Sequence, residues 1–376
     1  MQTNDKSIRD LMAAIHTGRT KLPDFQRDWV WDDDRIRNLI ASITCNFPIG
    51  TAMFLEYGND SVRFKYREVK SAPKNEDVVP SELILDGQQR MTSIYSALYS
   101  TAPVETKNEK NQDILRFYYI DIEKALDPSC DRAEAVFSVP ESRIVTSNFG
   151  RDIDLDLSDR TKEFEKKVFP LNIILNYPET QKWQNEYYKF YEHDPKISDE
   201  FTDFSTNVII QTMEYKIPII TLGKETPKEA VCQVFENVNT GGVSLTVFEL
   251  VTAVFAMDDF ELRTDWEKRQ KDYFSGSLLP IITATDFLTA CTLLSSYKKG
   301  GTVSCKKKDV LNLTLDEYKL YADKLSEGFV EAEKFLGEER IFLRKDLPYS
   351  TQLIPLAVLC TLSRRGQSVQ FHSYQK

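Results

Sequence analysis

A glycine between an aspartate and two glutamines directly precedes a helical pattern, in the order Asp86, Gly87, Gln88, Gln89, Arg90. A short apolar run before it is typical of a strand, so the glycine lies at the start of a helix. Backbone N–H groups and the helix dipole stabilise anions there. Gly87 allows close backbone approach, and Arg90 can bind two phosphate oxygens. The segment therefore predicts a phosphate-binding loop, with a nucleoside triphosphate as the best candidate ligand.

Asp86 extends this chemistry, because a carboxylate can hold Mg²⁺ or a ribose hydroxyl. A structural interpretation explains the same residues equally well. In that case Asp86 only caps the helix, and Arg90 pairs with a carboxylate. The loop alone does not separate the two interpretations.

A second polar segment, Gln26 and Arg27, stands beside Trp29 and Trp31. Charged side chains are rarely buried without partners, so packing explains Gln26 and Arg27 poorly. Two tryptophans, however, are typical of a core. Taken alone, the stretch favours a structural role.

Two further segments are candidates for binding. One joins two predicted helices and contains Asn237, Asn239, Thr240, Gly241 and Gly242. It could cradle an anion or a base, or serve only as a glycine-dependent helix end and turn. The other is basic and is typical of a solvated loop, but it is also a candidate contact to a DNA backbone. Its lysines are Lys298, Lys299, Lys306, Lys307 and Lys308.

The composition excludes several classes of protein. The 376 residues carry a net charge of −10, whereas a dedicated DNA binder is usually basic overall, so any contact with nucleic acid must be local. Six cysteines without a C-x-x-C pair and three scattered histidines argue against a structural zinc site, a disulfide framework and histidine-based metal catalysis. No apolar run reaches the roughly 18 residues of a membrane span. We therefore expect a folded cytoplasmic protein.

The expected elements that position these residues form an α+β domain over residues 1–150, followed by a mainly helical region over residues 151–376 that contributes the Asn-Thr-Gly-Gly loop. Strands are predicted at 51–57, 62–69, 82–85, 114–122 and 217–222, the last as an edge strand because it contains Pro218. Helices are predicted at 8–15, 32–43, 91–99, 183–192, 199–214, 227–238, 286–297, 316–336 and 352–362. A further helix is predicted to start at residue 247. Capping boxes mark the helices that start at 227 and 247.

Together these segments resemble the N-terminal domain of GmrSD-type, modification-dependent restriction endonucleases, whose fold is similar to the ParB and sulfiredoxin superfamily. The similarity spans residues from about 20 to 250 in the order that the family shows. Its hallmarks are Leu22-Pro23 with Phe25-Gln26-Arg27 and Trp31, Pro48-Ile49-Gly50, Leu85 to Arg90 with Thr92-Ser93, and Phe235 with Asn237, Asn239 to Gly242 and Leu245. The resemblance implies triphosphate binding and hydrolysis, coupled in larger relatives to DNA cleavage during defence against phage.

Carried onto this sequence, the resemblance gives each segment a role. Asp86, Gln89 and Arg90 are the expected catalytic residues: Asp86 organises Mg²⁺, Arg90 neutralises phosphate charge, and a glutamine (Gln26, Gln88 or Gln89) orients water. The expected nucleotide contacts are Gln26, Arg27, Gly87, Gln88, Thr92, Asn237, Asn239, Thr240, Gly241 and Gly242.

The sequence departs from many relatives, which continue into an H-N-H nuclease domain. Only His372 lies near its end, so we expect a truncated or stand-alone form that lacks the nuclease. Expected partners are a nucleoside triphosphate and, as further candidates, DNA, a separate nuclease domain or subunit, and a second copy of the chain. Two alternatives stay open: a DNA-binding regulator that senses nucleotide without turnover, and a nuclease acting through the N-terminal fold.

Overall fold

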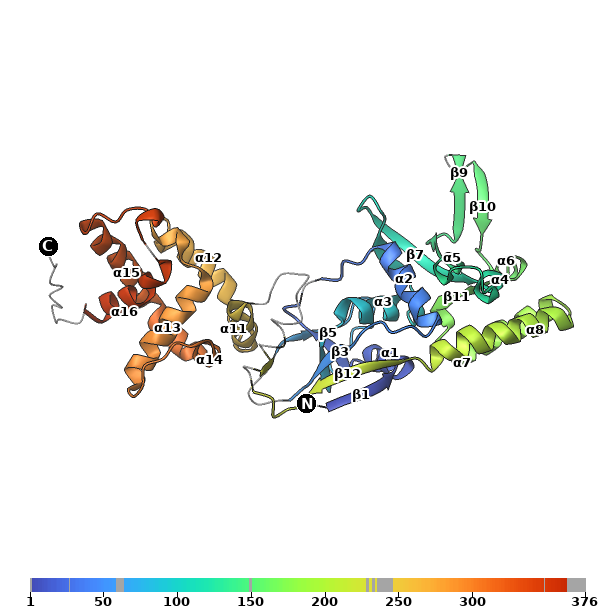
Figure 1. Cartoon of the computed structure of the whole chain (residues 1–376), viewed down its shortest axis with the longest axis horizontal. Coiled ribbons are helices and arrows are strands. Elements are labelled where there is room, and N and C mark those ends of the chain that lie inside the picture. The colour runs from blue at the N-terminus through green and yellow to red at the C-terminus, as the bar shows by residue number, and fades with distance from the viewer. Residues whose placement is uncertain are drawn as a thin grey trace. The chain divides into compact units, whose positions relative to one another are not determined.

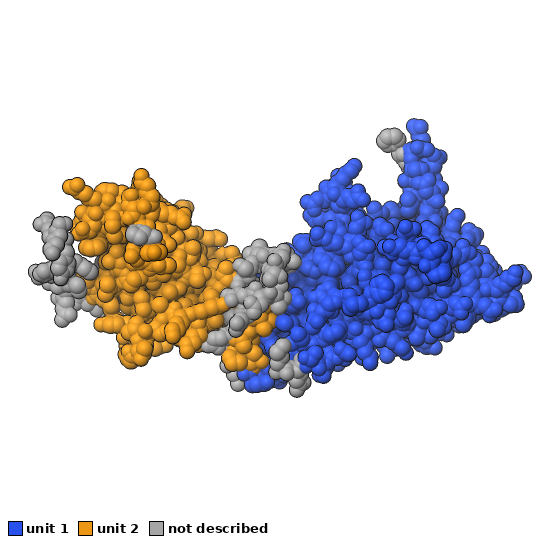
Figure 2. Space-filling model, viewed as in Figure 1, with its two compact units in different colours: residues 1–59, 66–225 blue, residues 60–65, 226–376 orange. Residues whose placement is uncertain are grey.

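The chain folds into two compact units. The computed structural model describes residues 2–26, 28–58, 64–148, 151–227, 230–231, 234, 246–347 and 349–363. Unit 1 comprises Met1–Asn59 and Tyr66–Glu225, and unit 2 comprises Asp60–Lys65 and Thr226–Lys376 (Figure 2). Unit 1 thus extends well beyond residue 150, where the change in sequence pattern suggested a boundary.

The central sheet of unit 1 explains this extension. Six of the described strands pair in the order β1 (Gln2–Ser7), β12 (Lys216–Leu222), β3 (Ala52–Glu56), β5 (Glu82–Asp86), β2 (Thr20–Pro23) and β4 (Tyr66–Arg67). β12 runs antiparallel to β1 and parallel to β3, so a late strand inserts between two early ones (Figure 1). The mixture of strands and helices confirms the predicted α+β class.

The prediction that residues 217–222 form an edge strand is wrong, since β12 has a neighbour on each side. Pro218 is nevertheless tolerated for a local reason. It lies opposite Asp5 of β1, whereas the pairing with β3 begins one residue later, at Ile219. The proline therefore has a paired strand on one side only, as an edge residue would.

Three helices pack together in the core of unit 1: α1 (Ile8–His16), α2 (Asp33–Thr44) and α3 (Gln88–Leu98). The apolar spacing that predicted α1 is confirmed, because Ile8, Leu11, Met12 and Ile15 are all buried. The acidic start of α2 acts as expected: the Asp32 side chain accepts a hydrogen bond from the Arg35 amide at 2.8 Å.

A second sheet flanks this core. It contains β11 (Val168–Pro170), β7 (Asp113–Asp121) and β6 (Val104–Lys107), with β8 (Val136–Pro140) also paired to β7. A separate hairpin, β9 (Ile144–Ser147) and β10 (Asp152–Asp156), projects from the unit (Figure 1). Of these strands only β7 was predicted. The helices of this part are α4 (Ile122–Leu126), α5 (Arg132–Ala135), α6 (Arg160–Glu165), α7 (Tyr177–Phe190), α8 (Pro195–Phe204), a π-helical turn (Ser205–Ile210) and α9 (Gln211–Met213).

The described part of unit 2 is mainly helical, as predicted. Its described helices are α11 (Val247–Phe255), α12 (Leu262–Tyr273), α13 (Ala284–Lys299), α14 (Lys307–Leu311), α15 (Leu315–Glu338) and α16 (Leu353–Ser363). Thr246 and Glu249 form the capping box expected before α11. The predicted helix 227–238 and the loop residues 237–242 lie largely or wholly outside the described residues. Within the part of the chain described, no helix is long and apolar enough to cross a membrane.

Candidate functional site

The predicted phosphate loop forms the turn between β5 and α3. β5 ends at Asp86, Gly87 adopts a left-handed conformation with φ of 86°, and α3 begins at Gln88. A Cβ atom at Gly87 would lie 3.1 Å from the Ala52 Cβ, so both backbone angle and space favour glycine. Gly87 has no side chain to cap the first N–H groups of α3, while the Asp86 side chain is 34% exposed beside them. The first N–H groups of α3 therefore have no side-chain cap from Gly87, which is the condition that an anion site at a helix start requires.

Arg90 ties this turn to the neighbouring loop. Its Nη1 donates to the Ile49 carbonyl at 2.7 Å and its Nη2 to the Thr51 carbonyl at 2.8 Å. The guanidinium also lies 3.6 Å from the Asp86 carboxylate. Two of its five N–H groups hold the loop, so Arg90 has a positioning role in addition to its charge.

Gln89 is also committed to structure. Its Oε1 accepts a hydrogen bond from the Val30 amide at 2.9 Å, and its Nε2 donates to the Asp28 carbonyl at 3.2 Å. The Trp29 indole N–H donates to the Gln89 carbonyl at 3.2 Å. Both polar ends of the Gln89 side chain thus hold residues 28–30, and the water-orienting role expected from the sequence would require these bonds to break.

Gln26, in the turn after β2, reaches the end of β5. Its Nε2 donates to the carbonyls of Ile84 and Leu85, at 2.7 and 3.0 Å, at the end of β5. Its Oε1 is buried and has no hydrogen-bond partner among the described residues. The structure therefore brings two segments separated by some 60 positions together, as the predicted site requires. Arg27 lies outside the described residues.

The remaining predicted contacts are less accessible or lie in the other unit. Gln88 and Thr92 are 8% and 1% exposed, within the first two turns of α3. The five lysines gather near the end of α13 and the start of α14 in unit 2, and all are exposed. Lys299 pairs there with Glu317.

A pocket of about 370 Å³ lies beside residues 29–31, and no sequence pattern indicated it. Two neighbouring tryptophans indicate a core, but a sequence pattern does not say which face of an aromatic ring is covered. The opposite wall comes from the β6–β7 hairpin and includes Ile114 and Leu115. This pocket adjoins the segment that Gln89 holds.

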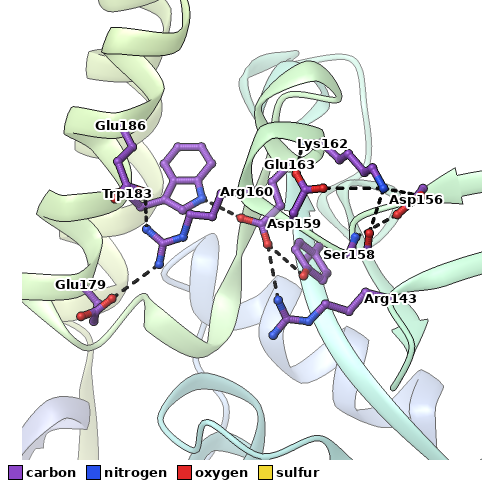
Figure 3. Close-up of polar contacts among 11 residues, drawn as sticks. Arg143, Asp156, Ser158, Asp159, Arg160, Lys162, Glu163, Glu179, Trp183 and Glu186 are labelled. Atoms are coloured by element: carbon purple, nitrogen blue, oxygen red, sulfur yellow. Dashed lines mark hydrogen bonds and ion pairs between the residues drawn. The ribbon is translucent and has the colours of Figure 1, made fainter.

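A second polar cluster, centred on Glu163 of α6, lies elsewhere in unit 1 (Figure 3). The carboxylate accepts hydrogen bonds from Trp183 Nε1 at 2.9 Å and from the Tyr119 hydroxyl at 3.1 Å, and Arg143 lies 3.9 Å away. Burial raises the pKa of Glu163 although these partners favour its charged form. At 2% exposure the carboxyl is closed to a substrate, so the cluster serves to connect α6, β7 and α7.

Comparison with known proteins identifies the family of this chain. Residues 8–256 match the family described as the N-terminal domain of GmrSD restriction endonucleases. The chain is also 31% identical over 323 residues to an uncharacterized protein of Methanocaldococcus jannaschii, in a match covering 82% of this chain and 51% of that protein. It thus spans about half the length of this curated relative. The family match covers two thirds of the sequence, including the β5–α3 turn and its neighbours, and the chain therefore belongs to the family of GmrSD restriction endonuclease N-terminal domains.

Proposed function

We propose that unit 1 binds a nucleoside triphosphate at the start of α3 and hydrolyses it, within a restriction-type system that acts against phage. The observation that carries the proposal is the meeting of three features at one helix start. They are the partly exposed Asp86 carboxylate, the left-handed turn at Gly87, and the buried Gln26 oxygen without a partner among the described residues. A buried acceptor without a partner is costly in a folded protein, and a ligand or water at this position would satisfy it.

The roles follow from the contacts. The first N–H groups of α3 bind phosphate oxygens, and Arg90 holds the loop at residues 49–51 in place while adding positive charge. Gln89 positions residues 28–30, so Gln26 and Gln88 remain the candidates for orienting a water molecule. Arg27 and the Asn-Thr-Gly-Gly loop remain sequence-based candidates for the same ligand.

Mg²⁺ fits this site through one ligand, Asp86. Protein-bound Mg²⁺ commonly takes one or two carboxylates and completes its shell with phosphate oxygens and water. Among the described residues no group of three or more His, Cys, Asp or Glu side chains could hold a metal ion. When bound, it would neutralise charge on the phosphate oxygens.

Binding is tested by thermal unfolding with each of the four nucleoside triphosphates and Mg²⁺. A ligand that binds only the folded state adds about 2.7 kcal/mol of stability at a hundredfold excess over Kd, so the melting temperature should rise. Release of inorganic phosphate then distinguishes an enzyme from a regulator that only senses nucleotide. No shift with any triphosphate at millimolar concentration would remove the basis of the proposal.

Asp86→Asn gives the matching test of the site. We expect it to abolish the magnesium-dependent part of nucleotide binding, because the amide is a poor ligand for Mg²⁺. Asp34→Asn is the control, since Asp34 also lies at a helix start and pairs with an arginine, Arg37, at 3.1 Å. If both variants lose the magnesium-dependent part of nucleotide binding to the same extent, the assignment of Asp86 is contradicted.

A further inference from the structure

The pocket beside residues 29–31 has an apolar wall and a charged rim. Its wall includes Trp31, Ile114 and the half-exposed Val30. At about 370 Å³ it lies near the small end of the range for ligand pockets, and is suited to one ring system.

Two ion pairs form the rim. Lys70 lies 3.0 Å from Glu105, and Lys107 lies 3.9 Å from Asp113. All four side chains are more than a third exposed, so they can exchange these contacts for bonds to a ligand at small cost. Together they offer both donors and acceptors around the apolar wall.

The pocket is joined to the start of α3 through Gln89. Trp29 donates its indole N–H to the Gln89 carbonyl, and the Val30 amide donates to the Gln89 side chain. The next residue, Trp31, is partly buried, and its carbonyl accepts a hydrogen bond from Thr106 at 2.7 Å. The wall of the pocket is thus fixed to the same helix turn that the phosphates would occupy.

We propose that this pocket receives the base of the nucleotide, an inference that rests on the proposed function. A base presents a flat aromatic face and edges that carry donors and acceptors. Lys70 already lies over the ring of Trp29, at 5.4 Å from its centroid. Because Lys70 occupies the face of Trp29, Trp31 provides the surface on which the base stacks. The two ion pairs of the rim contact the edges of the base.

The test compares a nucleoside triphosphate with inorganic tripolyphosphate, which has the phosphates but no base. Calorimetric titration of the full chain with Mg²⁺ measures both affinities. Trp31→Ala should weaken nucleotide binding roughly fivefold to a hundredfold, the usual effect of removing one base-stacking ring, and leave tripolyphosphate affinity unchanged. Trp31→Phe should retain most of the nucleotide affinity. Tyr177→Ala, an exposed aromatic on α7, is the control and should change neither.

Failure of this inference is distinguishable from failure of the proposed function. If the wild-type chain binds neither ligand, the phosphate site itself is refuted. If it binds nucleotide and Trp31→Ala binds equally well, only the base pocket is refuted. Should Trp31→Ala not fold, Glu105→Gln decides, because this exposed rim residue should alter the relative affinities of the four triphosphates. If Glu105→Gln leaves the relative affinities of the four triphosphates unchanged, the inference is overturned.

Discussion

Glu163 shows what one buried carboxyl does to the stability of unit 1. Its three partners, Tyr119, Trp183 and Arg143, come from separate segments of the chain, so the residue connects elements that local sequence does not link (Figure 3). The net effect of burial is a pKa above the ordinary value of 4.5. The folded state therefore holds this proton more tightly than the unfolded state does.

This proton predicts a pH dependence with a definite sign. Tighter proton binding by Glu163 stabilises the folded state fully at a pH below the pKa that Glu163 has in the unfolded chain. This stabilisation is lost as the pH rises through the pKa that Glu163 has in the folded protein. Relative to Glu163→Gln, the wild-type free energy of unfolding should thus decline above pH 4.5. The decline is about 1.4 kcal/mol for each tenfold difference in proton affinity between the folded and the unfolded state. Urea unfolding of both proteins from pH 4 to 8 measures this decline. A curve for Glu163→Gln that runs parallel to the wild-type curve would contradict the assignment.

The turn before α3 was predictable in form, but the contacts of its residues were not. The Asp-Gly-Gln-Gln-Arg order predicted a turn at a helix start, and the structure has that turn at Gly87. What the pattern could not show is that Gln89 and Arg90 face different loops, near residues 29 and 50. Those contacts depend on where distant segments return, and local spacing carries no information about that.

At the scale of elements, Gly328 allows α15 and α16 to pack closely. A Cβ atom there would lie 2.6 Å from the Ala357 carbonyl and would also collide with the Thr361 hydroxyl. Gly328→Ala should therefore force the two helices apart and cost about 1–3 kcal/mol, as overpacking typically does. Denaturant unfolding of the full chain measures the loss.

Gly337, near the end of α15, is the matched control. A Cβ there would meet only Phe342 Cε1 at an ordinary 3.7 Å. Gly337→Ala should leave stability unchanged or raise it by up to about 1 kcal/mol, because alanine favours helix more than glycine does. Similar effects of the two substitutions would show that close helix packing does not explain Gly328.

Helices were easier to predict than strands. Thr246 and Glu249 mark the start of α11 through a capping box that involves only neighbouring residues. The polar strand β1 was missed because its sequence, QTNDKS, contains no apolar residue and only one β-branched residue, Thr3. Its pairing with β12 makes it a strand. Tertiary pairing thus overrides local propensity.

At the scale of the molecule, the two units should unfold separately. Phe204 of unit 1 and Phe329 of unit 2 are both fully buried. Phe204→Ala and Phe329→Ala should each cost about 3–5 kcal/mol, and each should lower a different transition in scanning calorimetry. A single transition that moves with both substitutions would show that the units unfold as one.

The place of β12 also has a consequence for synthesis on the ribosome. β3 pairs with β5 soon after both are made, but its other edge waits for β12, about 170 residues later in the chain. At about 5–20 residues per second, that edge stays unpaired for roughly 8–34 seconds. An open strand edge is a template for wrong pairing, so the nascent chain is most exposed to aggregation in this interval. Nascent chains stalled before residue 216 should then bind chaperones more strongly than chains stalled well beyond residue 222.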